Sequence, residues 1–301
     1  MFLVFLTYAL FASIFTVGKM ALSTLPPFFI TGIRYLLAGI FLCSFGALKG
    51  YLRKFPPWPH IPILLGIGIF NVFLTNGLEF WGMQYLSSGR TCLFYSMSPF
   101  YSVILSYFCL NEKMTLRKWI GLIIGILGFI ILIMEKDLSE SENHLWKIGN
   151  FSIAEIAVSF SAFSAVLGWI FFKKLTDQKK YPIILSNGYS FIIGGLLGML
   201  ISFIYEPFSL YQTSHNSSTL LWQIIYITIV HSIICYSLYA NALRTFSVTF
   251  MMFAGITNPM FAALYGWIFI NEEISKNFIL CILLVGFGLY LFYLDERKNN
   301  S

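Results

Sequence analysis

The chain has 301 residues, of which 58% are hydrophobic and only 11% charged, against roughly 45–50% and 25% in soluble domains. This small number of charged side chains cannot cover the surface of a soluble protein of this length. The composition therefore excludes a water-soluble fold and predicts an integral membrane protein. The net charge of +6 comes without a dense basic patch, which excludes the nucleic-acid-binding class.

Apolar runs between charged or proline-rich breaks predict the membrane spans, because about 20 apolar residues cross the hydrocarbon core as a helix. In chain order these runs are Met1–Gly18, Phe28–Leu48, Ile61–Tyr85, Arg90–Leu110, Trp119–Met134, Phe151–Phe172, Pro182–Tyr205, Thr219–Leu243, Val248–Ile270 and Phe278–Leu294. No basic residue precedes the first run, so we expect a true span there and not a signal peptide. The sequence therefore predicts an all-α integral membrane protein with ten transmembrane helices.

The lysines and arginines predict the orientation, because they accumulate in cytoplasmic loops. With both termini inside, the inner loops and tail hold thirteen of the nineteen Lys and Arg, the outer edges hold five, and Arg34 lies within a span. We therefore predict a multi-pass protein of the cytoplasmic (inner) membrane with both termini cytoplasmic. The five cysteines lie in apolar runs without a Cys-x-x-Cys pair or a histidine at metal spacing, so neither a metal site nor a cofactor is expected.

An internal repeat divides the chain. Ser98-Pro99 and Asn258-Pro259 lie in mid-span, 160 residues apart, and thirteen residues after each proline comes an acidic residue, Glu112 or Glu272. Halves with an odd number of spans insert in opposite directions, as in transporters built from inverted repeats. We predict two inverted five-helix halves, residues 1–134 and 151–301, joined by an outer loop over residues 135–150.

Several of these segments resemble a known family. Arg34-Tyr35-Leu36-Leu37-Ala38, the two proline-to-glutamate segments and the turn Ala242-Leu243-Arg244 are similar to the drug/metabolite transporter superfamily, in particular its ten-span EamA-type members. Tyr189 departs from the pattern, since it stands about where an arginine would repeat. The resemblance implies two inverted halves around a central cavity that opens alternately to the two sides. It also implies a small metabolite as substrate, such as an amino acid, a nucleotide-related compound, a carboxylate or a vitamin.

Polar residues follow one stripe of the third predicted span. Asn71, Thr75 and Glu79 are spaced at i, i+4 and i+8, which places them on one face of an α-helix. The positions 160 residues later are His231, Cys235 and Tyr239. If the halves are inverted, the two stripes should face each other across the cavity.

Charged and titratable residues inside the predicted spans are the candidate site residues, because polar groups in the hydrocarbon need a partner or a water-lined cavity. Arg34 and Glu79 lie at similar predicted depths and could pair, either to lock two helices together or to bind substrate or a proton. Proton coupling through Glu79 is a further hypothesis. His231, near mid-span, could donate and accept in the cavity or bond to one neighbouring helix.

Prolines and aromatics complete the predicted site. Pro99 and Pro259 can kink their helices, and Ser98 and Asn258 precede them with side-chain donors. Aromatic faces such as that of Tyr95 could stack on a planar ring or hold a cation, or could serve packing alone. The predicted substrate-binding set is Arg34, Asn71, Thr75, Glu79, Tyr95, Ser98, His231, Tyr236, Tyr239 and Asn258.

These features favour a secondary active transporter of a small organic metabolite, an amino acid or an adenosyl amino-acid compound such as S-adenosylmethionine. The expected partners are the solute, a coupling proton or a counter-substrate, and the lipid bilayer. Export of another metabolite or drug-like solute remains an alternative, and a membrane enzyme a weaker one. The chain has no Gly-x-Ser-x-Gly, His-Glu-x-x-His or Walker lysine motif, so neither hydrolysis nor direct use of ATP is predicted.

Overall fold

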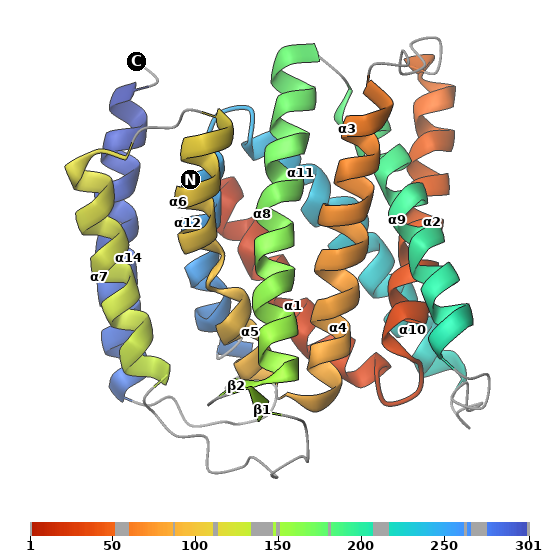
Figure 1. Ribbon diagram of the computed structural model, residues 1–301, viewed down its shortest axis with the longest axis horizontal. Coiled ribbons are helices and arrows are strands. Elements are labelled where there is room, and N and C mark those ends of the chain that lie inside the picture. Colours follow the sequence, from red (N-terminus) through yellow and green to blue (C-terminus); the bar gives the residue numbers. More distant parts are fainter. Residues whose placement is uncertain are drawn as a thin grey trace.

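The computed structural model describes residues 2–51, 60–86, 88–110, 114–133, 147–148, 151–179, 182–206, 217–261, 264–265 and 276–299. Within these ranges the regular structure is helical apart from two short antiparallel strands, β1 (Lys147–Ile148) and β2 (Phe151–Ser152). The predicted all-α class is confirmed (Figure 1). The predicted acidic positions Glu112 and Glu272 lie outside the described residues.

The α-helices follow the order of the predicted spans. They are α1 (Phe2–Ala21), α2 (Pro27–Leu48), α3 (Ile61–Gly66), α4 (Thr75–Tyr85), α5 (Ser88–Tyr95), α6 (Ser98–Leu110), α7 (Leu116–Ile133), α8 (Ile153–Lys179), α9 (Ile183–Tyr205), α10 (Ser217–Tyr226), α11 (Tyr236–Ala242), α12 (Val248–Ala254) and α14 (Lys276–Asn299). The helices α1, α4 and α9 end at the lower end of Figure 1, whereas α2, α8 and α14 end at the upper end. The chain therefore crosses the same layer repeatedly.

Six described helical segments are long and apolar enough to cross a membrane. They are Leu3–Ala21, Pro27–Leu48, Ile61–Tyr85, Ile153–Thr176, Ile183–Tyr205 and Ser218–Ala242, and shorter apolar helices cover Ser98–Leu110 and Val248–Phe261. Large apolar side chains also point outward, with Phe203 88% and Phe108 75% exposed. Such a surface suits lipid and not water.

Two of the long helices change to π geometry in mid-course. The π-helix η3 (Ile67–Leu74) joins α3 to α4, and η5 (Ile227–Cys235) joins α10 to α11. A π-helix bonds residue i to i+5, where an α-helix bonds i to i+4. Around η3 the side chains follow the same longer step, since Thr75 Oγ1 donates to Phe70 O at 2.7 Å and Asn76 Nδ2 to Asn71 O at 3.2 Å. The predicted i, i+4, i+8 stripe is therefore not one continuous face.

The helices that carry the two mid-span prolines are interrupted just before them. Helix α5 ends at Tyr95 and α6 begins at Ser98. Helix α12 ends at Ala254 and is followed by a 3-10 turn, η6 (Gly255–Thr257), before Asn258. Because proline removes a backbone donor and clashes with the preceding turn, such breaks free polar backbone groups in mid-membrane.

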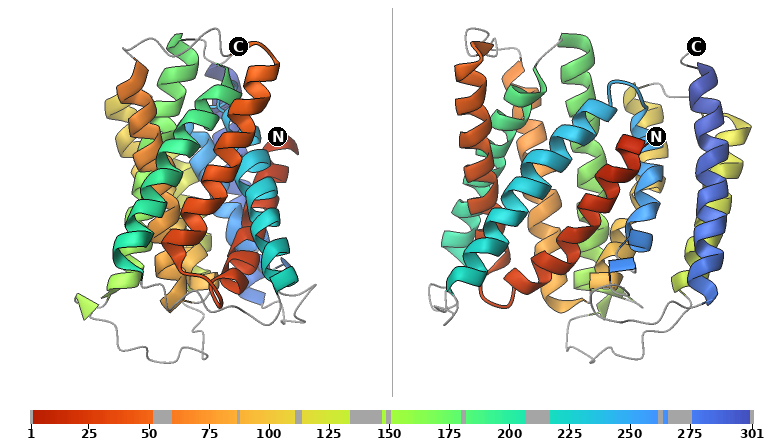
Figure 2. Two further views of the ribbon diagram at one scale, coloured as in Figure 1. Left: turned by 90° about the vertical axis from the view of Figure 1, so that its right-hand side faces the viewer. Right: turned by 180° about the vertical axis from the view of Figure 1, so that it is seen from behind.

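Glycines allow two helix pairs to approach closely. A Cβ atom on Gly198 of α9 would lie 2.9 Å from the Cα of Gly32 in α2. In the same way, a Cβ atom on Gly121 of α7 would lie 2.6 Å from the carbonyl oxygen of Gly288 in α14. Small residues are the usual means by which membrane helices pack. Helices α7 and α14 form a pair at one edge of the bundle, while the remaining helices surround its centre (Figure 2).

Candidate functional site

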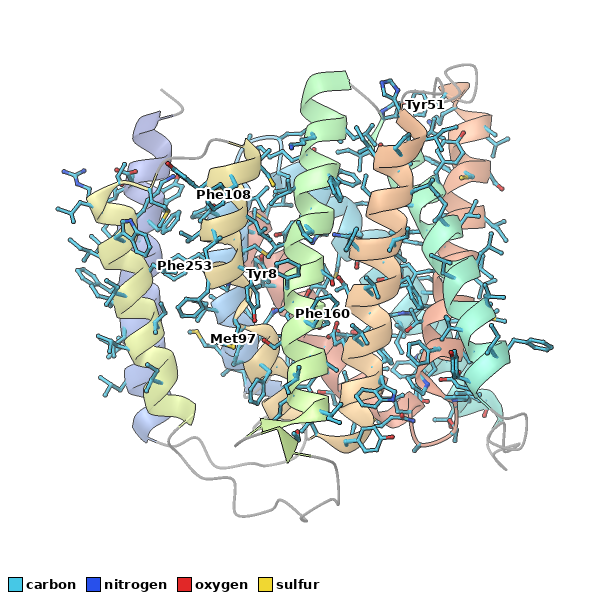
Figure 3. All side chains as sticks on the ribbon, viewed as in Figure 1. Tyr8, Tyr51, Met97, Phe108, Phe160 and Phe253 are labelled. Atoms are coloured by element: carbon cyan, nitrogen blue, oxygen red, sulfur yellow. The ribbon has the colours of Figure 1, made fainter. Side chains whose placement is uncertain are left out.

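A cavity lies at the centre of the bundle, where α1, α4, α8 and α11 meet the two interrupted helices. Its lining residues are Tyr8, Phe11, Ile14, Phe15, Asn76, Glu79, Tyr95, Ser98, Trp169, His231, Tyr236, Tyr239, Met252, Gly255 and Asn258. Figure 3 shows one of them, Tyr8, inside the bundle. The volume is about 50 Å³, room for roughly four water molecules. The cavity combines aromatic faces with amide, hydroxyl, imidazole and carboxylate groups.

Aromatic rings form one wall of the cavity. The Trp169 indole stacks on Tyr239 with ring centroids 4.1 Å apart and planes 26° apart, and it lies 5.2 Å from the Tyr236 ring. Phe11 meets His231 edge-on at 5.1 Å. A planar solute ring could extend this stack, because aromatic faces attract one another in offset or edge-to-face arrangements.

Part of the cavity wall presents hydrogen-bond acceptors. Glu79 is the one acidic side chain among the described lining residues, and it is 5% exposed. The oxygen of the Asn258 amide, on the opposite half of the chain, is buried and has no hydrogen-bond partner among the residues that the structure describes. Both groups are acceptors, so this part of the cavity suits a cation or a hydrogen-bond donor.

Arg34 lies behind the cavity wall and is fully buried. Its Nη2 donates to Asn76 Oδ1 at 2.8 Å and its Nη1 lies 3.4 Å from His231 Nδ1. The guanidinium also lies 4.5 Å from the centre of the Phe80 ring. Because a guanidinium has only donors, the contact with His231 is a hydrogen bond when Nδ1 is unprotonated. Arg34 thereby joins α2 to α4 and η5.

The predicted ion pair between Arg34 and Glu79 is not formed among the described residues. The guanidinium instead donates to the side-chain oxygen of Asn76. Asn76 lies one turn before Glu79 in α4, on the side of the helix that Arg34 reaches. A neutral amide can satisfy the guanidinium without neutralising Glu79. The carboxylate therefore remains available to the cavity.

Asn76 also joins the two halves of the chain. Its Nδ2 donates to Tyr236 Oη at 2.9 Å and to Val72 O at 2.9 Å, while Tyr236 Oη donates to Asn71 O at 3.1 Å. Such buried polar networks are stable when each member is satisfied. These bonds fix the Tyr236 ring in the cavity wall.

Seven of the ten predicted site residues line the cavity: Glu79, Tyr95, Ser98, His231, Tyr236, Tyr239 and Asn258. Arg34 supports the wall from behind, and the other two predicted residues face α8. Thr75 Oγ1 lies 3.4 Å from Ser161 O. In the amide orientation that satisfies both its oxygen and its nitrogen, Asn71 accepts from Trp169 Nε1 at 3.3 Å. Neither residue is among those that line the cavity, and the π-helix η3 changes the helical period between Asn71 and Glu79.

The sequence analysis missed Asn76, which both lines the cavity and binds Arg34. A polar side chain in mid-span was a usable signal, since such residues are rare without a partner or a function. Asn76 does not fall on the predicted stripe of Asn71, Thr75 and Glu79. Phe11 and Met252 also line the cavity, and apolar residues in a span carry no comparable signal.

The comparison with protein families decides the class of protein. The model of the EamA-like transporter family matches residues 1–134 and 152–294. The chain belongs to this family. It is thus an EamA-type member of the drug/metabolite transporter superfamily and a multi-pass integral membrane protein.

Similar proteins include named transporters. The S-adenosylmethionine/S-adenosylhomocysteine transporter of Chlamydia muridarum (strain MoPn / Nigg) is 31% identical over 99% of this chain and 92% of its own length. The protein of the same name from Chlamydia trachomatis serovar D is 29% identical over 99% and 90%. The uncharacterized transporter YoaV of Bacillus subtilis is 23% identical over 93% and 92%.

The fold is also found in a solved structure. One crystal structure superposes with a TM-score of 0.74 over 99% of this chain and 98% of that chain, at 16% sequence identity. At this identity the likeness shows a shared fold alone.

Proposed function

We propose that the protein is a secondary active transporter that carries S-adenosylmethionine or a closely related adenosyl compound across the cytoplasmic membrane by alternating access. One observation carries the proposal: the central cavity places the stacked rings of Trp169 and Tyr239 and the carboxylate of Glu79 around one space. An adenosyl sulfonium compound has both a planar ring and positive centres. The names of the two Chlamydia relatives support the same class of solute.

In the proposed binding mode, the adenine ring stacks against the aromatic wall and the positive centre faces Glu79. A cation near a carboxylate and aromatic faces is stabilised by both. Asn258 Oδ1, which is buried and has no partner within the described part of the chain, accepts from an amino group of the solute. Arg34 stays behind the wall, where it holds Asn76 and His231 in place.

Alternating access rests on ten spans arranged as two inverted halves, residues 1–134 and 151–301, joined by residues 135–150. Three pairs of element bounds support this arrangement. The π-helices begin at Ile67 and Ile227, 160 residues apart, and so do α7 and α14, which begin at Leu116 and Lys276. Helix α5 begins at Ser88 and α12 at Val248, again 160 residues apart.

The direction of the helices supports the inversion. Helix α2 runs upward in Figure 1, whereas α9 at the corresponding place in the second half runs downward. Helix α7 runs downward and α14 upward. Helix α1 begins and α14 ends toward the same end of the bundle. Because the predicted loops on the side of the termini, together with the C-terminal tail, hold most of the Lys and Arg, we place both termini in the cytoplasm.

The cavity must enlarge to admit the solute. At about 50 Å³ it is smaller than the roughly 300–1,000 Å³ typical of sites for drug-sized ligands. We therefore assign the conformation described to a closed stage of the proposed cycle. As the partner that drives the cycle we propose a counter-substrate of the same class, because the relatives' names pair two adenosyl compounds.

The experiment is exchange in proteoliposomes. Vesicles loaded with S-adenosylhomocysteine should take up radiolabelled S-adenosylmethionine, and empty vesicles should take up far less. Glu79→Gln should lower uptake at subsaturating solute about ten-fold or more, because a charged contact contributes about 1.5–3 kcal/mol. Glu206→Gln is the matched control, since Glu206 caps the N-terminus of α2 through Phe28 N and Phe29 N, away from the cavity.

Two results would overturn the proposal. The wild-type protein could fail to exchange adenosyl compounds while exchanging another metabolite, which would reject this solute. Alternatively, Glu79→Gln could behave like Glu206→Gln, which would remove Glu79 from the site. Uptake driven by a pH gradient into empty vesicles would replace the counter-substrate with a proton as the coupling partner.

A further inference from the structure

Two lysines bind the ends of cavity-lining helices at opposite ends of the bundle. Lys19, in the last turn of α1, donates through Nζ to the carbonyl oxygens of Met83 and Leu86, the latter at 2.8 Å. These carbonyls belong to the C-terminal end of α4 and the residue that follows it. Lys19 is half-buried, so the contact is partly shielded from solvent.

The second lysine makes the same contact in the other half. Lys173, in α8, donates through Nζ to Leu243 O at 2.9 Å and to Phe246 O at 3.1 Å. These acceptors follow the C-terminal end of α11. Leu243 and Phe246 stand 160 residues after Met83 and Leu86. The acceptors therefore stand at equivalent positions in the two halves, and their donors lie in α1 and α8, the first long helix of each half.

Both contacts lie one helical turn beyond the cavity. Lys19 follows the lining residue Phe15 by four residues, and Lys173 follows Trp169 by four. Their acceptors show the same spacing, since Met83 follows Glu79 and Leu243 follows Tyr239 by four residues. Each lysine thus ties together the two helices that would have to separate for solute to pass at its end.

A lysine bound to the carbonyl oxygens at a helix end forms a contact that can break reversibly. The C-terminal end of a helix carries partial negative charge and unpaired carbonyl oxygens, which an ammonium group can bind. A lysine ammonium is also strongly hydrated and sits on a flexible stem. Water that enters as the helices separate can take over its hydrogen bonds, so opening leaves no buried charge unpaired.

We propose that Lys19 and Lys173 are positioning residues that hold the two opposite ends of the cavity closed, Lys19 at the end where α1 and α4 terminate and Lys173 at the end where α8 and α11 terminate. In the conformation described both contacts are formed, as expected for a closed stage. The proposal rests on the proposed alternating access. Each opening releases one lysine and keeps the other.

The test measures access to the cavity from each side. A cysteine reporter, Ser98→Cys, is placed in a variant whose five native cysteines are replaced by serine or alanine, and its labelling by a membrane-impermeant maleimide is timed in right-side-out and inside-out vesicles. Lys19→Met should raise labelling from the side on which α1 ends at least three-fold and lower it from the other side. Lys173→Met should do the reverse. Lys19→Arg and Lys173→Arg, which keep the donors, should restore the original ratio.

Lys174→Met is the matched control, because it removes the neighbouring positive charge of α8. It should leave both labelling rates unchanged. If Lys19→Met or Lys173→Met does not give a monodisperse protein, the glutamine variant, which removes the ammonium charge and shortens the side chain but stays polar, is measured in the same way. Equal changes on both sides, or changes of the same direction in the two variants, would overturn the proposal.

The outcomes separate this proposal from the proposed function. If labelling responds with opposite signs but no adenosyl compound is exchanged, the lysine contacts control access and the solute assignment is wrong. If adenosyl compounds are exchanged and neither lysine variant changes the labelling ratio, the transport function stands and the closing role of the lysines is wrong.

Discussion

Asn76 Nδ2 donates a hydrogen bond of 2.9 Å to Tyr236 Oη, and the two residues stand 160 positions apart in the chain. This is the same offset that separates the two π-helices and the helices α7 and α14. The bond therefore joins, at the wall of the cavity, two positions that correspond in the proposed repeat. Arg34 binds the other end of the Asn76 amide, which extends the contact into α2.

Arg34→Lys separates a structural from a binding role for this arginine. One ammonium group cannot reach both Asn76 and His231 while lying over the Phe80 ring as the planar guanidinium does. We expect the variant to lose about 1–3 kcal/mol of stability, measured by thermal unfolding in detergent. Because Arg34 does not line the cavity, the Kd for S-adenosylmethionine should change less than about three-fold, within 1 kcal/mol.

Arg117→Lys is the control for this exchange, because Arg117 is exposed at the start of α7. It should change neither stability nor affinity. A Kd that rises ten-fold in Arg34→Lys at unchanged stability would place Arg34 in contact with the solute.

Trp169→Ala tests the aromatic wall. Removing the indole takes away the ring that stacks on Tyr239, with centroids 4.1 Å apart, and that in our proposal also contacts the solute ring. We expect the Kd for S-adenosylmethionine to rise about three- to ten-fold, in line with the 0.5–1.5 kcal/mol of an aromatic pair. Trp169→Phe, which keeps a ring, should remain within about two-fold of the parent by the same measure.

Trp222→Ala serves as the matched control in the same titration. Trp222 also stacks on a tyrosine, Tyr226 at 5.3 Å, but is 55% exposed and does not line the cavity. An equal loss of affinity in both alanine variants would show that the effect is not local to the cavity.

Gly288→Ala tests the close approach of α14 to α7. A Cβ atom at Gly288 would lie 2.4 Å from the carbonyl oxygen of Gly121, so the two backbones must move apart. Overpacking of this kind costs about 1–3 kcal/mol, which thermal unfolding in detergent would record. Gly286→Ala, two residues away on the same helix, meets nothing within 4 Å and should not lower stability. Equal midpoints for the two variants would contradict the described packing.

Much of the architecture follows from composition and spacing. The helical class and the repeated crossings were predictable because backbone N–H and C=O groups in lipid must be hydrogen-bonded within the segment. The interruptions before Pro99 and Pro259 were predictable because proline has no backbone N–H to donate. Glu79 and His231 were recognisable for a related reason: titratable groups at depth are costly and therefore informative.

Two differences between the predicted and the observed arrangement come from backbone geometry and from competition among hydrogen-bond partners. Asn71 and Thr75 were predicted to line the cavity because α-helical spacing places them on the same face as Glu79. No residue type in the sequence indicates the π-helix, and in the structure both side chains lie toward α8. Arg34 was expected to bind Glu79 because the two charges are opposite. The structure gives it Asn76 and His231 instead, a choice that depends on side-chain positions which spacing alone does not resolve.

The π-helix η3 also has a consequence for the rotation of the helix that follows it. In an α-helix each residue advances about 100° around the axis, so one residue more or less within Ile67–Leu74 would turn all of α4 by that angle. Deleting one residue there would leave the span apolar and long enough for the bilayer, yet would rotate Glu79 and Asn76 away from the cavity. The direction in which the α4 side chains point thus depends on the number of residues per helical turn in η3 as much as on the identity of those side chains.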